Sequence, residues 1–346
     1  MPRIGPENYI TNQIYRLSMT QNYPTSDLSV KGTNPKCPQC NSSKKVVRAG
    51  FRKIAEGQVQ RYICRSCQKN FSIKPLPRTS YPPKIIFSAI STYNLGYSPI
   101  DTIKITNKRF KTHIPKSTLY SWLVRYKDIC TFHNLRKKYQ IDPKDIIFSK
   151  KFYHKQVYEF KFHKLKLNIL GKQYPTLKSY LTDLPKELDN RMFKNGLRCS
   201  DFPFELKFKK PKITKYNTNN ATKIARFGLE LAKTNRERHQ AIEDFFLIND
   251  SATVAVEIPA FLTQKEARFF GISIPKTLTG HIDILQVRRN RIHILDYKPD
   301  AQSDKLAKEQ LTLYALSLGK RTNIPPKKMT CAYFDENGYF QLTPSL

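Results

Sequence analysis

The chain has 346 residues, of which 61 are Lys or Arg and 27 are Asp or Glu, so its formal net charge is +34. The excess lies in residues 1–220, with 43 basic against 13 acidic side chains, whereas residues 221–346 hold 18 against 14. Such a concentration of cations predicts a polyanionic partner. An anionic membrane surface would also attract it, but no long apolar span or lipidation signal accompanies the charge, which favours nucleic acid. A hydrophobic content of 39% suffices for real cores in two or three domains.

After an N-terminal arm at residues 1–30, two C-x-x-C pairs stand out within residues 31–75. Thiolates in two such turns, separated by a short β-rich stretch, are typical of a tetrahedral zinc site. The expected Zn²⁺ ligands are Cys37, Cys40, Cys64 and Cys67. Disulfides are the alternative, but the N-terminus has no hydrophobic signal peptide. The other cysteines are isolated in sequence, which predicts a reducing, intracellular (cytoplasmic) location; they are Cys130, Cys199 and Cys331.

The segment from residue 36 to residue 72 is similar to the zinc ribbon at the N-terminus of insertion-sequence transposases. The shared features are both cysteine pairs, the KKVVRAG strand and the run QRYICRSCQKNFS. This resemblance implies a docking module for nucleic acid or protein. A zinc clip with a purely structural role is the alternative.

Residues 76–130 follow a proline-rich joint and show three helical patterns, over residues 85–96, after Pro99, and over 114–127. They predict a helix-turn-helix whose recognition helix opens at Lys116 or Ser117. The wording IPKSTLYSW resembles helix-turn-helix segments that follow this ribbon in transposases. A generic three-helix packing unit is the alternative. The side chains expected to face the core are Leu119, Trp122 and Leu123, and those expected to contact DNA are Lys116, Thr118, Tyr120, Ser121 and Arg125.

Residues 131–215 are predicted to be a basic connecting region. Lysines alternate with aromatic residues over 135–170 as on a strand, and residues 177–193 have a helical pattern. The strands could grip a nucleic-acid backbone and stack on unpaired bases, or they could be an ordinary pair with an aromatic core and solvated lysines. Residues 207–223 are expected to be an exposed basic linker.

The most informative stretch is GHIDILQVRRNRIHILDYKP at residues 280–299. It places Asp283 in one apolar strand and Asp296 with Lys298 at the end of a second strand, after a basic turn. Carboxylates bind hard cations such as Mg²⁺, which neutralise phosphodiester charge and generate hydroxide. Side chains 296 and 298 share one face, and the carbonyl of Tyr297 stays free as a further oxygen ligand. Lys298 would orient or deprotonate the attacking water.

These residues resemble the PD-(D/E)XK nuclease superfamily, and within it the RecB-like branch. The matching pieces are GHID, DYK, and the Q-x-x-x-Y of Gln310 and Tyr314, which would position the DNA backbone or brace the active-site helix. The resemblance implies that His239, on an upstream helix, is a third metal ligand. Glu243, one turn later, and Glu257, on the strand before GHID, are expected to have at most supporting roles near the metal.

The predicted architecture is therefore multidomain, with a small β zinc ribbon, a helical helix-turn-helix, a basic connecting region and a C-terminal α/β nuclease domain. That domain, at residues 216–346, is expected to have a central mixed sheet flanked by helices. The predicted function is a Mg²⁺- or Mn²⁺-dependent deoxyribonuclease from a mobile element, virus or defence system. It would act on double- or single-stranded DNA, with RNA and a homodimer left open.

Two other functions stay open at this point. The chain could be a non-catalytic DNA-binding regulator that uses the nuclease fold as a scaffold, although the presence of Asp283, Asp296 and Lys298 together argues against it. It could also be a transposition-associated protein. A transposase core needs three carboxylates spread over a different fold, whereas the acidic residues here cluster around the DYK run.

Overall fold

The computed structural model describes residues 35, 37–40, 42, 44–54, 57–72, 80–154, 156–188, 196–199, 212–216, 219–232, 234 and 237–344. The chain divides into two compact units, Met1–Ile85 and Ile86–Leu346. The predicted N-terminal arm and most of the proline-rich joint lie outside the described residues. In the part of the chain that is described, no helix is both long and apolar enough to span a membrane.

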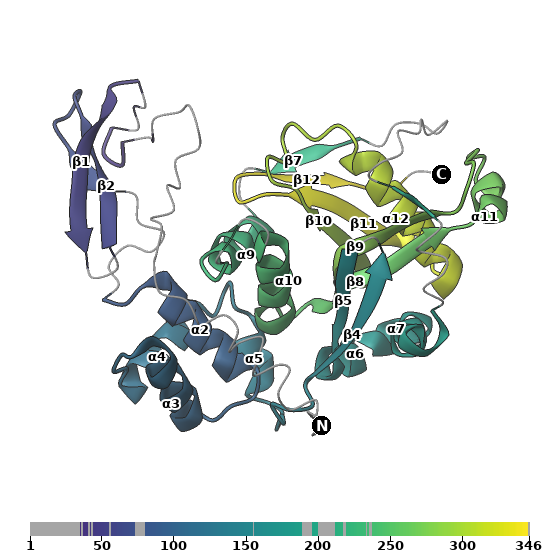
Figure 1. Cartoon of the computed structure of the whole chain (residues 1–346), viewed down its shortest axis with the longest axis horizontal. Coiled ribbons are helices and arrows are strands. Elements are labelled where there is room, and N and C mark those ends of the chain that lie inside the picture. The colour runs from purple at the N-terminus through teal and green to yellow at the C-terminus, as the bar shows by residue number, and fades with distance from the viewer. Residues whose placement is uncertain are drawn as a thin grey trace. The chain divides into compact units, whose positions relative to one another are not determined.

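The first unit contains a three-stranded antiparallel sheet with the order β1-β2-β3 (Figure 1). Its strands are β1 (Val46–Ile54), β2 (Gly57–Cys64) and β3 (Asn70–Ser72). The buried side chains of this unit form a very small core around Val46 and Tyr62, with Phe71 stacked on Tyr62 at 5.7 Å between ring centroids. Because so little apolar surface is buried, a fold of this size usually needs a cross-link or a metal.

The second unit is organised around a mixed sheet to which nine described strands contribute (Figure 1). Eight of them follow the order β4-β5-β8-β9-β10-β11-β12-β7, and β6 pairs with β9. Their bounds are β4 (Ile147–His154), β5 (Gln156–His163), β6 (Leu197–Arg198), β7 (Thr214–Tyr216), β8 (Thr253–Leu262), β9 (Leu278–Arg288), β10 (Arg291–Tyr297), β11 (Met329–Phe334) and β12 (Tyr339–Leu342).

The central strands are nearly continuous apolar runs because both faces of the sheet are covered. β9 and β10 form a hairpin through Arg289 and Asn290, which both have positive φ, as a two-residue type I′ turn requires. β10 continues through helix α12 (Ala307–Thr322) into the parallel strand β11. This crossover places the end of β10 and the start of α12 next to each other.

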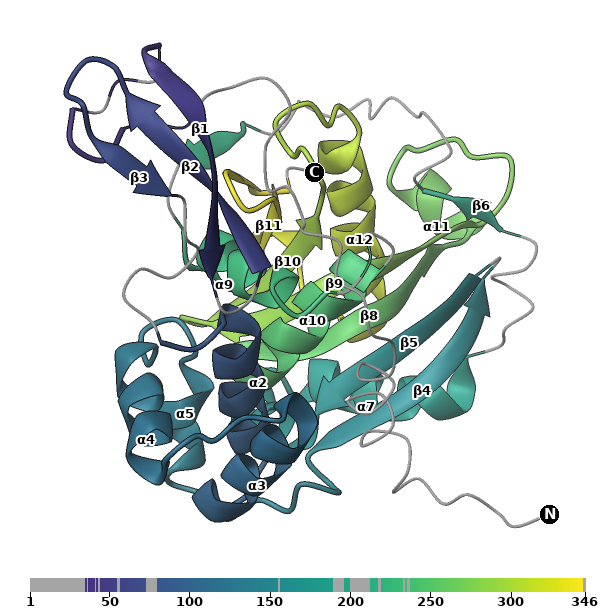
Figure 2. The same cartoon turned by 60° about the vertical axis from the view of Figure 1, so that its left-hand side comes forward.

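Helices cover the sheet on both faces (Figure 2). Helices α9 and α10 lie on one face, and α12 and α7 lie on the other. The helix bounds are α6 (Lys164–Leu170), the short 3-10 helix η1 (Gly171–Gln173), α7 (Pro175–Glu187), α9 (Asn220–Leu229), α10 (Arg238–Asn249), α11 (Gln264–Phe269) and η3 (Pro326–Lys328).

The region expected to be a helix-turn-helix forms α2 (Pro83–Asn94), α3 (Pro99–Phe110) and α4 (Lys116–Arg125), with the short α5 (Phe132–Arg136) after them. The side chain of Ser98 caps α3, and Pro99 occupies its first turn, a combination that favours helix initiation. In α4 the predicted core residues Leu119, Trp122 and Leu123 are buried. All five side chains expected to contact DNA lie on α4; those at positions 116, 120, 121 and 125 are exposed, and Thr118 is half-buried.

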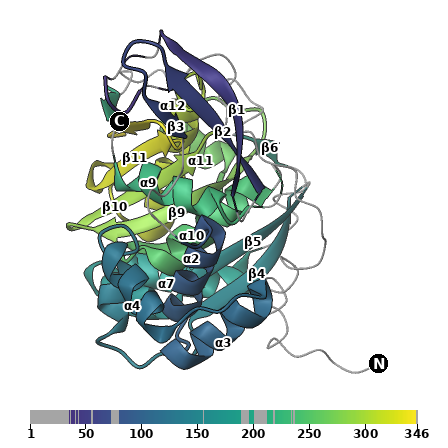
Figure 3. The same ribbon diagram turned by 90° about the vertical axis from the view of Figure 1, so that its left-hand side faces the viewer.

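This helical segment is packed onto α10 (Figure 3). The fully buried Asn249, at the end of α10, accepts a hydrogen bond from Asn94 Nδ2 at 2.9 Å and donates one to Ser91 Oγ at 2.9 Å. The ring of Phe87 stacks on Phe227 at 4.1 Å. Because these contacts are buried and specific, α2 is joined to the sheet-bearing unit and does not hang on a linker.

The expected connecting region differs from its sequence pattern in three places. β4 and β5 do form a hairpin, but β5 also pairs with β8, so both strands extend the central sheet. The sheet therefore includes strands from both sides of the domain boundary expected at residue 215. Residues 164–170, predicted as strand, form α6 because the chain turns inward there and buries Lys166 and Leu167. Within the expected basic linker, residues 214–216 pair with β12 as β7, and α9 begins at Asn220.

Candidate active site

Acidic side chains from three adjacent strands meet in the middle of the sheet. β8 and β9 pair Val256 with Ile284 and Ile258 with Ile282, which places Glu257 opposite Asp283. β10 pairs Leu295 with Ile284, so Asp296 follows beside Asp283. The backbone N–H of Tyr297 donates to Asp283 Oδ2 at 2.9 Å. The structure therefore brings together the two carboxylates that the sequence separates by 13 positions.

Lys298 is held by a chain of polar contacts. Its Nζ lies 2.9 Å from Asp296 Oδ2 and donates to Gln310 Oε1 at 3.0 Å. Gln310 Nε2 in turn donates to the hydroxyl of Tyr314 at 2.7 Å. Burial opposes the protonated form of Lys298, but the charges of Asp296 and Asp283 outweigh it and raise the pKa of the ammonium. Lys298 is thus a fixed cation in the metal-free protein.

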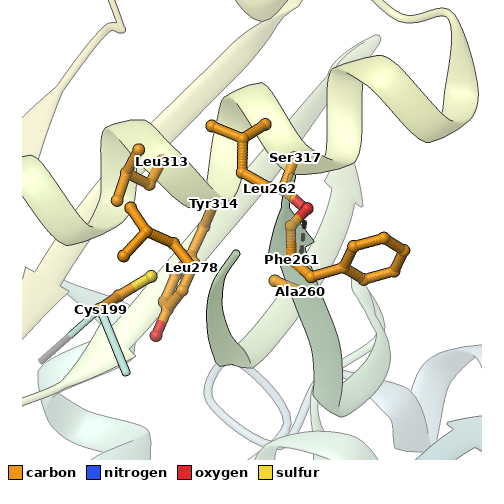
Figure 4. Close-up of a pocket in the computed structure, with 8 residues that line it drawn as sticks. All are labelled: Cys199, Ala260, Phe261, Leu262, Leu278, Leu313, Tyr314 and Ser317. Carbon is orange, nitrogen blue, oxygen red and sulfur yellow. Dashed lines mark hydrogen bonds between the residues drawn. The ribbon is translucent and has the colours of Figure 1, made fainter. Parts of the chain in front are cut away.

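Tyr314 reaches this chain because residue 280 is glycine. A Cβ at Gly280 would lie 2.5 Å from the Tyr314 hydroxyl and 2.7 Å from the ring, so any larger residue would displace the tyrosine. Figure 4 shows the Tyr314 ring beside Leu278 and Cys199, with the other lining residues of this small pocket around it. The glycine of the GHID run therefore positions Gln310 and Lys298 indirectly.

His239 is in contact with Tyr297, which is next to Asp296 in the chain. His239, on the first turn of α10, has Nε2 2.9 Å from the carbonyl oxygen of Tyr297. Burial lowers the pKa of this imidazole, although the Tyr297 carbonyl and Asp296 act against it. A neutral imidazole and a carbonyl oxygen are both metal-ligand types. Arg238, which precedes His239, donates to the Tyr297 hydroxyl at 3.1 Å and forms an ion pair with Glu336 at 3.4 Å.

Glu243 and Glu257 extend the acidic cluster toward α10. Burial is the main cause that raises the pKa of Asp283 and of Glu243 well above the usual value and that of Glu257 to about 7, and neighbouring carboxylates add to it for all three. Glu257 has φ of 52° inside a strand, a conformation that costs energy for a residue with a side chain. Strained backbone at such a position is found most often where function requires it.

The donor types of this cluster suit a hard divalent cation. Four carboxyl groups share one buried region, and the Oε1 atom of Glu243 and the Oε2 atom of Glu257 have no hydrogen-bond partner among the described residues. Buried carboxylates without a partner are costly unless they are protonated or bind a cation. An oxygen-rich set with one imidazole is the donor chemistry of Mg²⁺ or Mn²⁺ sites.

Sequence reasoning did not find the charges that lie behind this cluster. Lys161 on β5 is buried and pairs with Asp244 at 2.7 Å and Glu159 at 3.2 Å. Its charge acts on both Glu243 and Glu257 and offsets part of the rise in their pKa values. The lysine-aromatic alternation over residues 147–163 was visible in the sequence, but nothing in it distinguishes this one inward lysine from the exposed ones.

The four cysteines predicted to bind zinc are also brought together, in the first unit. Their sulfur atoms all lie within 4.8 Å of one another, so the group could hold a metal ion. Cys37 Sγ is 3.5 Å from Cys67 Sγ, and Cys40 Sγ is 3.5 Å from Cys64 Sγ. Each contact joins one C-x-x-C pair to the other, as a tetrahedral four-thiolate site requires.

The raised carboxyl pKa values predict how the stability of the metal-free protein depends on pH. The folded protein keeps protons on Glu257 up to about pH 7, whereas the unfolded chain releases them near its ordinary pKa, so stability falls as the pH rises through this window. We expect a lower melting temperature in EDTA at about pH 8 than at about pH 5.5, and a larger stabilisation by Ca²⁺ or Mn²⁺ at the higher pH.

The variant Glu257→Gln should flatten this pH dependence, and Asp128→Asn, at an exposed carboxylate outside the cluster, should leave it as in the wild type. Melting curves followed by circular dichroism provide the measurement. An unchanged pH dependence in Glu257→Gln would show that this carboxyl group does not carry the effect.

Comparison with known proteins gives one match, in the C-terminal half. Residues 186–341 match the family model of the PD-(D/E)XK nuclease superfamily. Comparisons with curated proteins and with solved structures gave no match. The matched range contains every residue of the acidic cluster, together with Lys298, Gln310 and Tyr314, and its sheet is mixed and flanked by helices. Residues 186–341 of this chain are therefore similar to the PD-(D/E)XK nuclease superfamily.

Proposed function

We propose that the protein is a divalent-metal-dependent deoxyribonuclease of the RecB-like branch. The observation that carries the proposal is the convergence of Asp283, Asp296 and Lys298 at one point of the sheet, with His239 beside them on α10. The match of this region to the superfamily model supports phosphodiester hydrolysis as the reaction. Nucleic acid as substrate also agrees with a net charge of +34.

Asp283 and Asp296 would hold Mg²⁺ or Mn²⁺, with the Tyr297 carbonyl and His239 as further ligands. When bound, the metal polarises the phosphodiester and lowers the pKa of a coordinated water. Glu243 and Glu257 lie close enough to change the charge of the site, and their raised pKa values indicate protons that a cation would replace. We therefore assign them a larger share in cation binding than the sequence suggested.

The protein contributes a fixed ammonium to the reaction. Lys298 contacts both Asp296 and Gln310, so its Nζ can orient the attacking water or stabilise charge on the phosphate. Gln310 and Tyr314 are positioning residues, because each acts on the reaction through Lys298. Cation binding at Asp296 and Asp283 would offset the carboxylate charges that raise the pKa of Lys298, so that Lys298 could release a proton more readily.

We also propose that the N-terminal half targets the enzyme to DNA. α4 exposes Lys116, Tyr120, Ser121 and Arg125 while its opposite side is buried, the arrangement expected of a recognition helix. The four-thiolate group would bind zinc and form a transposase-like ribbon that docks on DNA or on a protein. A protein of a mobile element, virus or defence system would combine these parts.

A non-catalytic DNA-binding regulator is the second candidate. The single observation in its favour is that Lys298 contacts both Asp296 and Gln310, which is also what a structural ion pair would show. The same cleavage experiment separates the two functions.

The purified protein should cleave DNA only with Mg²⁺ or Mn²⁺. We expect Asp296→Asn to abolish cleavage, because a metal ligand is lost, and Lys298→Ala to slow it by about 10²- to 10⁴-fold. The matched control is Lys276→Ala, an exposed lysine outside the cluster. Supercoiled plasmid, linear duplex and single-stranded DNA should be compared on gels. Tight binding of all three without cleavage in either metal would favour the regulator.

DNA selection tests the role of α4. When random-sequence duplexes are selected for binding, the wild type should enrich a common motif, and Tyr120→Ala with Ser121→Ala should weaken or alter it, because these side chains would reach base edges. Lys172→Ala, an exposed cation on η1, should leave the motif unchanged. The same enriched motif in the α4 variant and the wild type would assign recognition to another part of the chain.

Metal analysis tests the thiolate group. The chain purified without added chelator should contain about one zinc ion, and Cys40→Ala should reduce this to near zero because a three-thiolate site is incomplete. Cys130→Ala, which changes a cysteine outside the group, should retain the ion. Mass spectrometry of the bound metal gives the result, and full zinc content in Cys40→Ala would remove these cysteines as ligands.

A further inference from the structure

A second group of side chains borders the acidic cluster and has no part in the mechanism above. Arg198, on the short strand β6, donates from Nη2 to the hydroxyl of Tyr158 at 2.8 Å. The ring of Tyr158, on β5, stacks on His281 of β9, with 3.8 Å between centroids and 18° between planes. We call these three residues the Arg198 group. They lie on three separate strands, between positions 158 and 281 of the sequence, and only the fold brings them together.

The group forms where the sheet loses its ladder between β5 and β8. These strands pair only at Lys161 with Val256 and at Phe162 with Ala255. Beyond that point Glu257 has a positive φ and Pro259 has no N–H to donate, so the pairing cannot continue. The side chain of Tyr158 on β5 therefore reaches past β8 to β9, where it contacts His281. His281 is paired with Pro259 in the β8–β9 ladder.

This position is directly beside the proposed catalytic carboxylates. His281 and Asp283 are two residues apart on β9 and so lie on the same face of the strand. The pKa of Tyr158 is raised by burial and by the charges of Glu257 and Asp283, while Arg198 lowers it. The phenol to which Arg198 donates is therefore within reach of the charges of the acidic cluster.

Arg198 differs in its partner from the other basic side chains around the acidic cluster. Lys298 is paired with Asp296, Arg238 with Glu336, and Lys161 with Asp244 and Glu159. Within the described part of the chain, Arg198 has a neutral phenol as its partner and no carboxylate within ion-pair distance. A half-buried guanidinium with one N–H engaged has four donors left, enough for a forked contact with an anion.

We propose that Arg198 binds a backbone phosphate of the nucleic-acid substrate, next to the phosphate that is cleaved. Tyr158 fixes the orientation of the guanidinium, and His281 fixes the ring of Tyr158. A polyanion that approaches four carboxyl groups needs cations at its flanks as well as a metal at its centre, and Arg198 supplies one such flank. This inference rests on the proposed nuclease function, but its binding test does not require cleavage.

The first test measures binding alone. In an Asp296→Asn background with Ca²⁺, the affinity for a fluorescent oligonucleotide should be measured by anisotropy over a range of salt concentrations. Arg198→Ala should weaken binding by about tenfold and reduce the slope of log affinity against log salt by about 0.7 to 0.9, one phosphate contact. Arg268→Ala, an exposed arginine on α11, should change neither quantity.

The second test locates the phosphate. Oligonucleotides that carry one neutral methylphosphonate at successive positions are cleaved, and the cut sites are mapped. Wild type should lose cleavage at a fixed offset from the neutral linkage, Arg198→Ala should no longer show this gap, and Tyr158→Phe should show a weaker one.

An Arg198→Ala variant with the wild-type salt slope and the wild-type pattern of gaps would overturn the proposal. So would equal losses of affinity in Tyr158→Phe and Arg198→Ala with every gap retained in both variants, since Arg198 would then only brace the tyrosine. If the wild type does not cut any DNA, the proposed nuclease function fails, and the salt slope still decides whether Arg198 contacts a phosphate.

Discussion

The burial of like charges at the junction of β8, β9 and β10 is the constraint on which the rest of the structure depends. Asp283, Glu243 and Glu257 have raised pKa values because they are removed from water beside one another and beside Asp296. A fold keeps such groups together only at a cost, and the usual compensation is a cation or a proton. The neighbouring elements are arranged so that either can be supplied at the same point.

The two helices that cover opposite faces of the sheet each contribute to this point. α10 brings His239 and Glu243 from one side, and α12 brings Gln310 and, through Gly280, Tyr314 from the other. The far end of α10 binds Asn94 and Ser91 of α2. Any contact that α4 makes with DNA is therefore made by the same compact unit that holds the acidic cluster, and the ends of one helix connect them.

The distribution of cations explains how an acidic site can serve a polyanionic substrate. The described lysines and arginines closest to the cluster are mostly neutralised by carboxylates, so they set the geometry of the site without attracting phosphate strongly. Arg198 differs because its partner is the uncharged Tyr158. The positive charge that draws nucleic acid to the protein lies mainly in residues 1–220, away in sequence from the reacting groups.

The sequence by itself determined the local parts of this protein. Helical spacing and the capping signals at Ser98 and Pro99 predicted α3 and α4 with their buried residues, and the apolar runs around the GHID and DYK motifs predicted β9 and β10. These features depend on neighbours a few positions away, so they can be read from one chain. The short motifs also carried the family resemblance, because the chemistry of metal binding restricts which side chains can serve as ligands.

Only the tertiary structure decided which distant segments share the site. The pairing of β5 with β8 placed β4 and β5 in the central sheet, and the stack of Tyr158 on His281 joined residues from two separate hairpins. The raised pKa values of Glu243 and Glu257 depend on burial, and the charge pattern along the chain does not reveal burial. Long-range strand pairing and desolvation are properties of the packed molecule, and no local run of residues specifies them.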